Sequence, residues 1–132
     1  MHKAVCQCGA LSVSSDVDPD FVVACNCVAC QRRTGSPFGV GAYFKQVDLR
    51  IGGTPKTWSR SSDSGRGLVN HFCENCGTNV YWTLEMRPDH IGVAAGCFTA
   101  PLPEPARVIW TEAKHDWVVF PDHLPEFPKA TP

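Results

Sequence analysis

The residues of this chain that could do chemistry are its cysteines, seven of which fall in three short clusters. The clusters are Cys6-Gln7-Cys8-Gly9, Cys25-Asn26-Cys27-Val28-Ala29-Cys30 and Cys73-Glu74-Asn75-Cys76-Gly77. A cysteine pair in a turn that ends in glycine can direct both thiolates at one ion, while backbone N–H groups stabilise the charge on sulfur. Zinc suits soft thiolate ligands and has no redox chemistry that would damage them. The clusters therefore predict zinc binding, with two zinc ions per chain.

The first predicted site takes the two pairs that are followed by glycine, Cys6 with Cys8 and Cys73 with Cys76. Four thiolates complete a closed tetrahedral zinc site of the structural kind. The pairs are far apart in the sequence, so one ion would tie distant segments together. Such a site can contribute on the order of 10 kcal/mol to the folding of a small domain.

The second predicted site has only three thiolates, from Cys25, Cys27 and Cys30. Three protein ligands and one open position distinguish catalytic zinc from structural zinc, so we predict that these three cysteines form the catalytic centre. One alternative is that Cys97, His71 or another side chain closes the site as a fourth ligand. Another is that one zinc binds and the remaining cysteines are simply buried. Cys97 lies in an apolar run, and we expect it to be a buried thiol outside both sites.

Composition narrows the function classes and the compartment. The chain has 132 residues with 43% hydrophobic and 19% charged residues, which predicts one globular domain over residues 1–132. A formal charge of -1, without a block of Lys or Arg, argues against nonspecific binding of nucleic acid, although a local patch is compatible with that total. The N-terminus lacks the apolar segment of a secretory signal, and apolar stretches such as Ile91 to Phe98 are too short to span a membrane. We therefore expect a cytoplasmic protein, with reduced cysteines that bind metal in preference to forming disulfides.

The elements that must position these cysteines are short strands, because glycine and proline divide the chain throughout. Alternation is clearest in Asn79 to Leu84, whereas no apolar stripe of helical period runs for three turns. One short helix is expected around Val28 to Arg33, and the proline-rich tail from Pro101 is expected to wrap the core as an extended arm. The fold class predicted is all-β with long loops, with strands at residues 10–14, 21–24, 38–44, 47–51, 57–59, 68–72, 78–84, 90–95 and 108–111.

The order of these motifs resembles the glutathione-dependent formaldehyde-activating enzyme and centromere protein V family. The matching segments are Cys6 to Gly9, Cys25 to Pro37, Ser64 to Gly67 and Phe72 to Thr78, followed by Ala95-Gly96, Trp117 and Leu124 to Phe127. The match covers nearly the whole chain. One departure is Asn26, at a position where many members carry histidine.

The resemblance implies a β-tent fold related to zinc ribbons. It also implies a structural zinc on Cys6, Cys8, Cys73 and Cys76, and a second zinc on Cys25, Cys27 and Cys30 whose fourth position takes the substrate thiol. The implied activity is the condensation of glutathione with formaldehyde to S-hydroxymethylglutathione, formally a carbon–sulfur lyase running in reverse. A metal-bound thiol ionises readily, and its thiolate would attack the aldehyde carbon.

Residues for substrate binding follow from the chemistry of glutathione, which has two carboxylates. Arg32, Arg33 and Arg66 are candidates because an arginine can hold a carboxylate in a bidentate manner. The alternative is that all three are solvated surface charges. Ser36 lies in the Thr34-Gly35-Ser36-Pro37 segment, which reads as a turn at the rim of a pocket, and turn formation alone would explain it.

Two kinds of function remain open at this point. The first is a thiol-dependent carbon–sulfur lyase or synthase. The second is a noncatalytic zinc module for protein or nucleic-acid partners, for which the chain lacks a basic extension. Two other expectations concern single side chains: His71 is a strand residue that acts as an acid or base or is structural, and the four tryptophans are expected in the core, at Trp58, Trp82, Trp110 and Trp117.

Overall fold

The computed structural model describes residues 1–62 and 65–130, and strands dominate it. The chain divides into two compact units. The first comprises Met1–Asp20 and Ala42–Leu102, and the second comprises Phe21–Gly41 and Pro103–Pro132. The predicted all-β class is confirmed. A single functional domain over residues 1–132 remains a prediction.

The first unit contains a small antiparallel sheet with the order β1-β2-β5. Its strands are β1 (His2–Val5), β2 (Ser12–Ser15) and β5 (Leu49–Gly52), and the last follows a 3₁₀ turn at Gln46–Asp48. Ala4 pairs with Val13, and both side chains are fully buried while their neighbours along the strands are less so. This alternation is the period of a strand with one face on a core.

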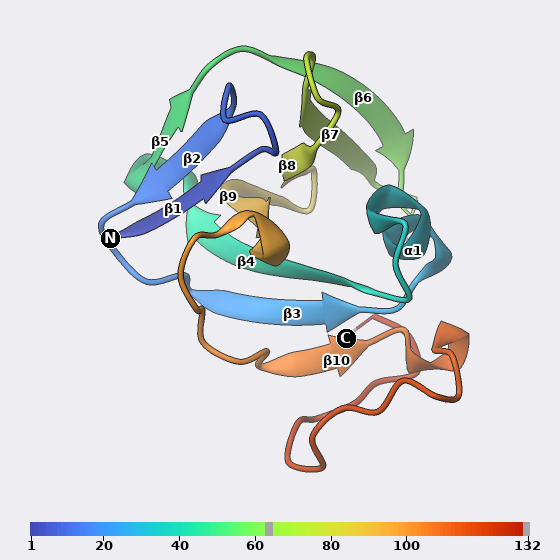
Figure 1. Cartoon of the computed structure of the whole chain (residues 1–132). Helices are drawn as coiled ribbons and strands as arrows, with labels where there is room; N and C mark the ends of the chain where they lie inside the picture. The colour runs from blue at the N-terminus through green and yellow to red at the C-terminus, as the bar shows by residue number, and fades with distance from the viewer. Residues whose placement is uncertain (63–64, 131–132) are drawn as a thin grey trace. The chain divides into compact units, whose positions relative to one another are not determined.

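Four strands of the second, seven-stranded sheet lie in the same unit, where they are antiparallel neighbours in the order β9-β8-β7-β6. In Figure 1 these strands run from green to olive-yellow. Val80 and Val93 are fully buried, as is Phe44 at the end of β4, the strand that leads from the second unit into the first. The bounds are β4 (Gly39–Lys45), β6 (Pro55–Ser61), β7 (Gly67–Cys73), β8 (Asn79–Leu84) and β9 (Arg87–Ala94).

The second unit is built on a parallel pair formed by β3 (Phe21–Cys25) and β10 (Arg107–Ile109). Its core contains Ala24, Val108 and Leu124, with the partly buried Phe38, Val40 and Phe120 packed against them. The tail returns alongside β10, since the Val108 N–H donates to the Pro125 carbonyl at 2.8 Å and the Phe127 N–H donates to the Val108 carbonyl at 2.9 Å. Figure 1 shows this tail in orange to red. The tail also supplies Val108 and Leu124 to the core, so it is a part of this unit and not only the arm around it that was predicted.

Several sequence predictions need correction. Strand β1 was missed, and residues 10 and 11 precede β2 instead of belonging to it. Residue 95 starts a 3₁₀ turn (Ala95–Cys97), and Trp110 has a left-handed backbone with φ 57°, so neither continues its strand. Trp58 and Trp117 are 60% and 71% exposed and are not core residues, whereas Trp82 is buried. Cys97 is half-buried instead of buried.

Candidate metal centres

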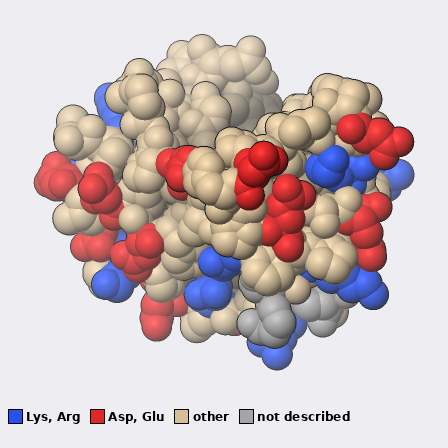
Figure 2. All heavy atoms as spheres, turned by 90° about the horizontal axis from the view of Figure 1, so that it is seen from below, with Lys and Arg blue, Asp and Glu red and all other residues tan. Residues whose placement is uncertain are grey.

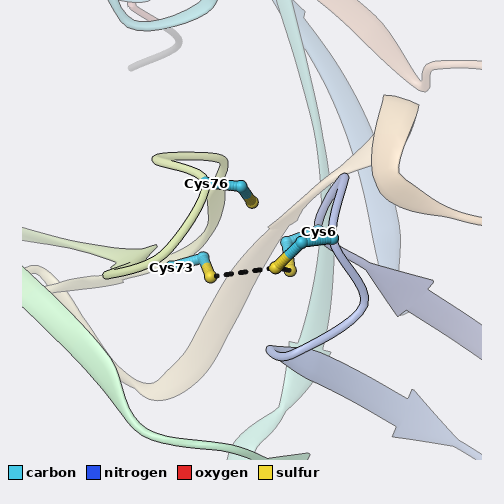
Figure 3. Close-up of side chains that lie close together, drawn as sticks. Cys6, Cys73 and Cys76 are labelled. Atoms are coloured by element: carbon cyan, nitrogen blue, oxygen red, sulfur yellow. Dashed lines mark hydrogen bonds between the residues drawn. The ribbon is translucent and has the colours of Figure 1, made fainter.

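The first cysteine cluster is assembled in the first unit from two hairpin turns. Cys6 and Cys8 lie in the turn between β1 and β2, and Cys73 and Cys76 lie at the turn between β7 and β8. The Sγ atoms of Cys6 and Cys8 are 3.6 Å apart, as are those of Cys8 and Cys73, and all four sulfurs lie within 4.8 Å of one another. Figure 3 shows Cys6, Cys73 and Cys76 directed toward one another from the two turns. The structure thus brings Cys6 and Cys8 together with Cys73 and Cys76, as expected from the sequence.

The two turns share a backbone design that depends on glycine. Gly9 and Gly77 have φ of 84° and 79°, a conformation that side chains with a Cβ rarely adopt. Each glycine N–H donates back to the carbonyl of the first cysteine of its turn, at 3.1 Å to Cys6 and at 2.8 Å to Cys73. The tight reversal brings both thiols of each turn to one side.

Backbone and hydroxyl groups around the first cluster stabilise charge on sulfur. The Leu11 N–H donates to Cys6 Sγ at 3.2 Å, and the Asn75 N–H donates to Cys73 Sγ at 3.4 Å. Thr78 Oγ1 lies 3.3 Å from Cys76 Sγ and also accepts the Gln7 N–H at 3.1 Å, so it joins the two turns. Thr78 was not predicted to be a site residue, although its place directly after Gly77 was a usable signal.

Hydrogen bonding and burial shift the pKa values of Cys76 and Cys73 in opposite directions. Hydrogen bonds from the Thr78 side chain and backbone lower the pKa of Cys76 to about 5. Backbone bonds also favour the thiolate of Cys73, but burial and the hydrogen bonds with Cys8 and Cys6 outweigh them and raise the pKa of Cys73 to about 11. Four thiolates within 4.8 Å of one another would repel each other unless a cation lay among them.

These residues fit a tetrahedral metal ion. A zinc–sulfur bond of about 2.3 Å places neighbouring sulfurs of a tetrahedron ~3.8 Å apart, close to the 3.6 Å separations found here. A divalent cation would also hold all four thiols as thiolates. The first cluster can therefore hold a metal ion with its own four ligands.

The second cluster lies in the second unit, where β3 gives way to the helix α1 (Val28–Thr34). Cys25 ends β3, Cys27 is the N-cap of α1, and Cys30 lies in its first turn. The Cys30 N–H donates to Cys27 Sγ at 3.3 Å, and the three sulfurs lie within 4.8 Å of one another. Within residues 1–62 and 65–130, no fourth His, Cys, Asp or Glu ligand atom belongs to this group.

Neighbouring thiols and burial favour the protonated forms of Cys25 and Cys30 in the second cluster. Hydrogen bonds with Cys27 and Cys30, together with burial, raise the pKa of Cys25. The pKa of Cys30 is also raised: the hydrogen bond with Cys25 lowers it, but the bond with Cys27 and burial act more strongly in the other direction. A cation that replaced these protons would relieve the repulsion among three thiolates, so this cluster also fits a metal ion.

The segment between the ligands is fixed by partly buried hydrogen bonds. Asn26 is fully buried, and both its backbone N–H and its Nδ2 donate to the Ile109 carbonyl, at 3.1 and 3.0 Å. Gln31 Nε2 donates to the carbonyls of Asn26 and Ala113, at 2.8 and 3.1 Å. Asn26 thus anchors the cysteine segment to the end of β10, a role that cysteine spacing could not predict.

The other candidate residues, His71, Cys97 and Ser36, belong to neither cysteine cluster. His71 and Cys97 belong to the first unit, where the His71 ring stacks on Tyr81 at 4.4 Å between centroids and burial lowers the His71 pKa. The Ser36 hydroxyl donates to the Phe38 carbonyl at 3.0 Å, within its own turn.

The three arginines differ in their surroundings. Arg32 is exposed at the end of α1, whereas Arg33 is half-buried. Arg66 is exposed and belongs to the first unit, and Ser64 of its motif lies outside the described residues. Binding of substrate by Arg32, Arg33, Ser36 and Arg66 remains a prediction.

The surface carries charges of both signs. On the face drawn in Figure 2, acidic side chains lie among the basic ones.

Of the helices in the described part of the chain, none has the length and apolar character needed to cross a bilayer.

Comparisons with known proteins place this arrangement in a family. No curated protein matches the chain. A crystal structure of a Rhodobacter sphaeroides protein is similar in fold, with a TM-score of 0.60 and 22% sequence identity, and the match covers 76% of this chain and 91% of that one. The sequence model of the glutathione-dependent formaldehyde-activating enzyme family matches residues 1–113, which include all eight cysteines. The chain belongs to the glutathione-dependent formaldehyde-activating enzyme family.

Proposed function

We propose that the protein is a zinc-dependent carbon–sulfur lyase or synthase that acts on the adduct of a small thiol, of the S-(hydroxymethyl)glutathione synthase type. The observation that carries this proposal is the second cluster, in which one short segment offers three sulfurs and no fourth ligand among the described residues. Membership of the family supports glutathione and formaldehyde as the substrates. Zinc, when bound, favours the thiolate form of a captured thiol.

The three cysteines of the second cluster would hold the metal and leave room for the substrate thiol. Cys25, Cys27 and Cys30 would act as ligands from one short segment, so a small thiol can approach without displacing a distant segment. The sulfur lone pair of the substrate thiolate forms the carbon–sulfur bond, and the carbonyl π pair moves to the aldehyde oxygen. That oxygen takes up one proton, which balances the proton that the thiol released on ionising. In the lyase direction the same bond breaks and the aldehyde is released.

The metal content should approach two zinc ions per chain in protein purified without chelators. Seven cysteines in two sulfur clusters provide the ligands, and each cluster fits one tetrahedral ion. Elemental analysis measures the ratio of zinc to protein. A reproducible value of one, with Cys25, Cys27 and Cys30 freely alkylated, would contradict the two-site proposal.

Addition of glutathione should increase the sulfur coordination of zinc, because the second cluster leaves a ligand position to the substrate. Zinc X-ray absorption spectroscopy of the thiol-free and thiol-bound protein measures this change. Arg32→Ala and Arg66→Ala should weaken glutathione binding by roughly 1–3 kcal/mol, the worth of a lost charged hydrogen bond. The matched control is 2-mercaptoethanol, which has no carboxylate and should bind these variants as it binds the wild type.

The thiol titration followed by zinc X-ray absorption tests both the identity of the thiol and the enzymatic proposal. If another thiol alters the zinc spectrum and glutathione does not, the lyase class stands and glutathione is wrong. If no thiol reaches the metal, the enzymatic proposal fails and a noncatalytic zinc module for protein or nucleic-acid partners replaces it.

A further inference from the structure

The two consecutive arginines that follow the second cluster have different surroundings. Arg33 lies three residues after Cys30 on α1, and residues at this spacing are neighbours on one side of a helix. Arg32, two residues after Cys30, points to another side and is exposed, whereas Arg33 is half-buried. In the sequence the two arginines are equivalent candidates, whereas in the structure they differ in burial.

The guanidinium of Arg33 is seated against a glycine of the neighbouring strand. Gly39, the first residue of β4, is buried, and a Cβ built there would overlap Arg33 Nη2 and lie 3.5 Å from Arg33 Cζ. Only a residue without a side chain leaves this space to the guanidinium. The placement of Arg33 therefore depends on two segments, the last turn of α1 and the start of β4.

The cluster beside Arg33 needs positive charge. A divalent zinc ion with three thiolates carries a net charge of about -1, and a captured thiolate makes it about -2. Uncompensated negative charge at a partly buried site is costly, and a cation nearby lowers that cost.

We propose that Arg33 is a positioning residue of the second cluster: held in place by the bare backbone at Gly39, its guanidinium compensates the charge of the thiolates and so allows an anionic thiol to enter. The inference rests on the proposed function for the uptake of a thiol, but the stability of the bound metal tests it independently. The role proposed for Arg33 differs from the carboxylate binding predicted for Arg32 and Arg66. A residue that binds a carboxylate of glutathione affects only thiols that carry one, whereas Arg33 affects every thiol.

The test compares Arg33→Gln, Arg33→Lys and Gly39→Ala with the matched control Arg32→Gln, all in protein loaded with cobalt(II). Titration with glutathione and with 2-mercaptoethanol is followed by the sulfur-to-cobalt charge-transfer absorption. Arg33→Gln should weaken binding of both thiols by about tenfold, the effect of one lost charged partner. Arg33→Lys should restore much of the affinity, and Arg32→Gln should leave 2-mercaptoethanol binding unchanged.

Gly39→Ala tests the placement of the guanidinium without removing it. The atom that its Cβ would meet is the far end of a flexible side chain, so Arg33 can move aside at small cost to the fold. This variant should therefore keep the thermal stability of the wild type and show the thiol binding of Arg33→Gln.

The rate at which a chelator removes cobalt from the second cluster gives a readout that needs no thiol. Arg33→Gln and Gly39→Ala should both release this metal several-fold faster than the wild type and Arg32→Gln, since their cluster is less well compensated. Equal release rates, or a loss confined to glutathione binding, would overturn the role proposed for Arg33. If the wild type takes up no thiol while the release rates differ as expected, the proposed function and the role of Arg33 in thiol entry fail, and only its compensation of the cluster's charge stands.

Discussion

Cys73→Ser is expected to abolish the cooperative fold of the protein at 25 °C. Cys73 belongs to the cluster that joins the β1–β2 turn to the β7–β8 turn, with its Sγ 3.6 Å from that of Cys8. Serine oxygen is a poor substitute for a thiolate toward zinc, so the variant loses one of four ligands and much of its metal affinity. The two turns then have no common ion to hold them together.

The size of the effect follows from the energies involved. A closed zinc site contributes on the order of 10 kcal/mol to a small domain, whereas the whole stability of a domain is about 5–15 kcal/mol. Loss of the site therefore removes most of the free energy of unfolding of the protein. Thermal unfolding followed by circular dichroism should show no cooperative transition for the variant, and elemental analysis should show that its first site has lost zinc.

The matched control is Cys97→Ser, the same change at the cysteine that belongs to neither cluster. Cys97 is half-buried, so this variant should stay folded with a full metal content and a loss of at most about 1–2 kcal/mol. A Cys73→Ser protein that melts as sharply as the Cys97→Ser protein would show that the first site does not hold the fold together.

Most strands could be predicted because their signals are local. The alternation in β8 and the β-branched and aromatic residues of β3 and β7 indicate strands without knowledge of any partner. Strand β1 (His2–Val5) was missed because a segment of four residues carries too little pattern. Its assignment depends on the register with β2, which is a tertiary property.

The cysteine grouping could be predicted for a similar reason. Spacing within a turn, followed by Gly9 or Gly77, determines where each pair of thiols can point, and four sulfurs are what a closed site requires. The exposure of Trp58 could not be predicted, because it follows from the position of β6 at the end of its sheet. Likewise, the overlap of a Gly39 Cβ with Arg33 joins two elements that no sequence motif connects.

Cys27→Ser is expected to give a folded protein that holds one zinc ion and captures no thiol. Cys27 has two roles, as a ligand of the second cluster and as the N-cap of α1 whose sulfur accepts the Cys30 N–H at 3.3 Å. Serine is among the best N-cap residues, so this change removes the metal ligand and keeps the cap. The apolar contacts of Ala24, Val108 and Leu124 do not involve Cys27 and should still hold the second unit.

The expected result is a cooperative thermal transition near that of the wild type, a zinc content of one, and formation of S-hydroxymethylglutathione slower by at least about 100-fold. Cys27→Ala is the matched variant, because it removes both the ligand and the cap and should cost about 1 kcal/mol more than the serine variant. The comparison with Cys73→Ser decides between two kinds of site. If Cys27→Ser unfolds as Cys73→Ser does, the second metal is as structural as the first, and the three cysteines are not the place where a substrate thiol enters.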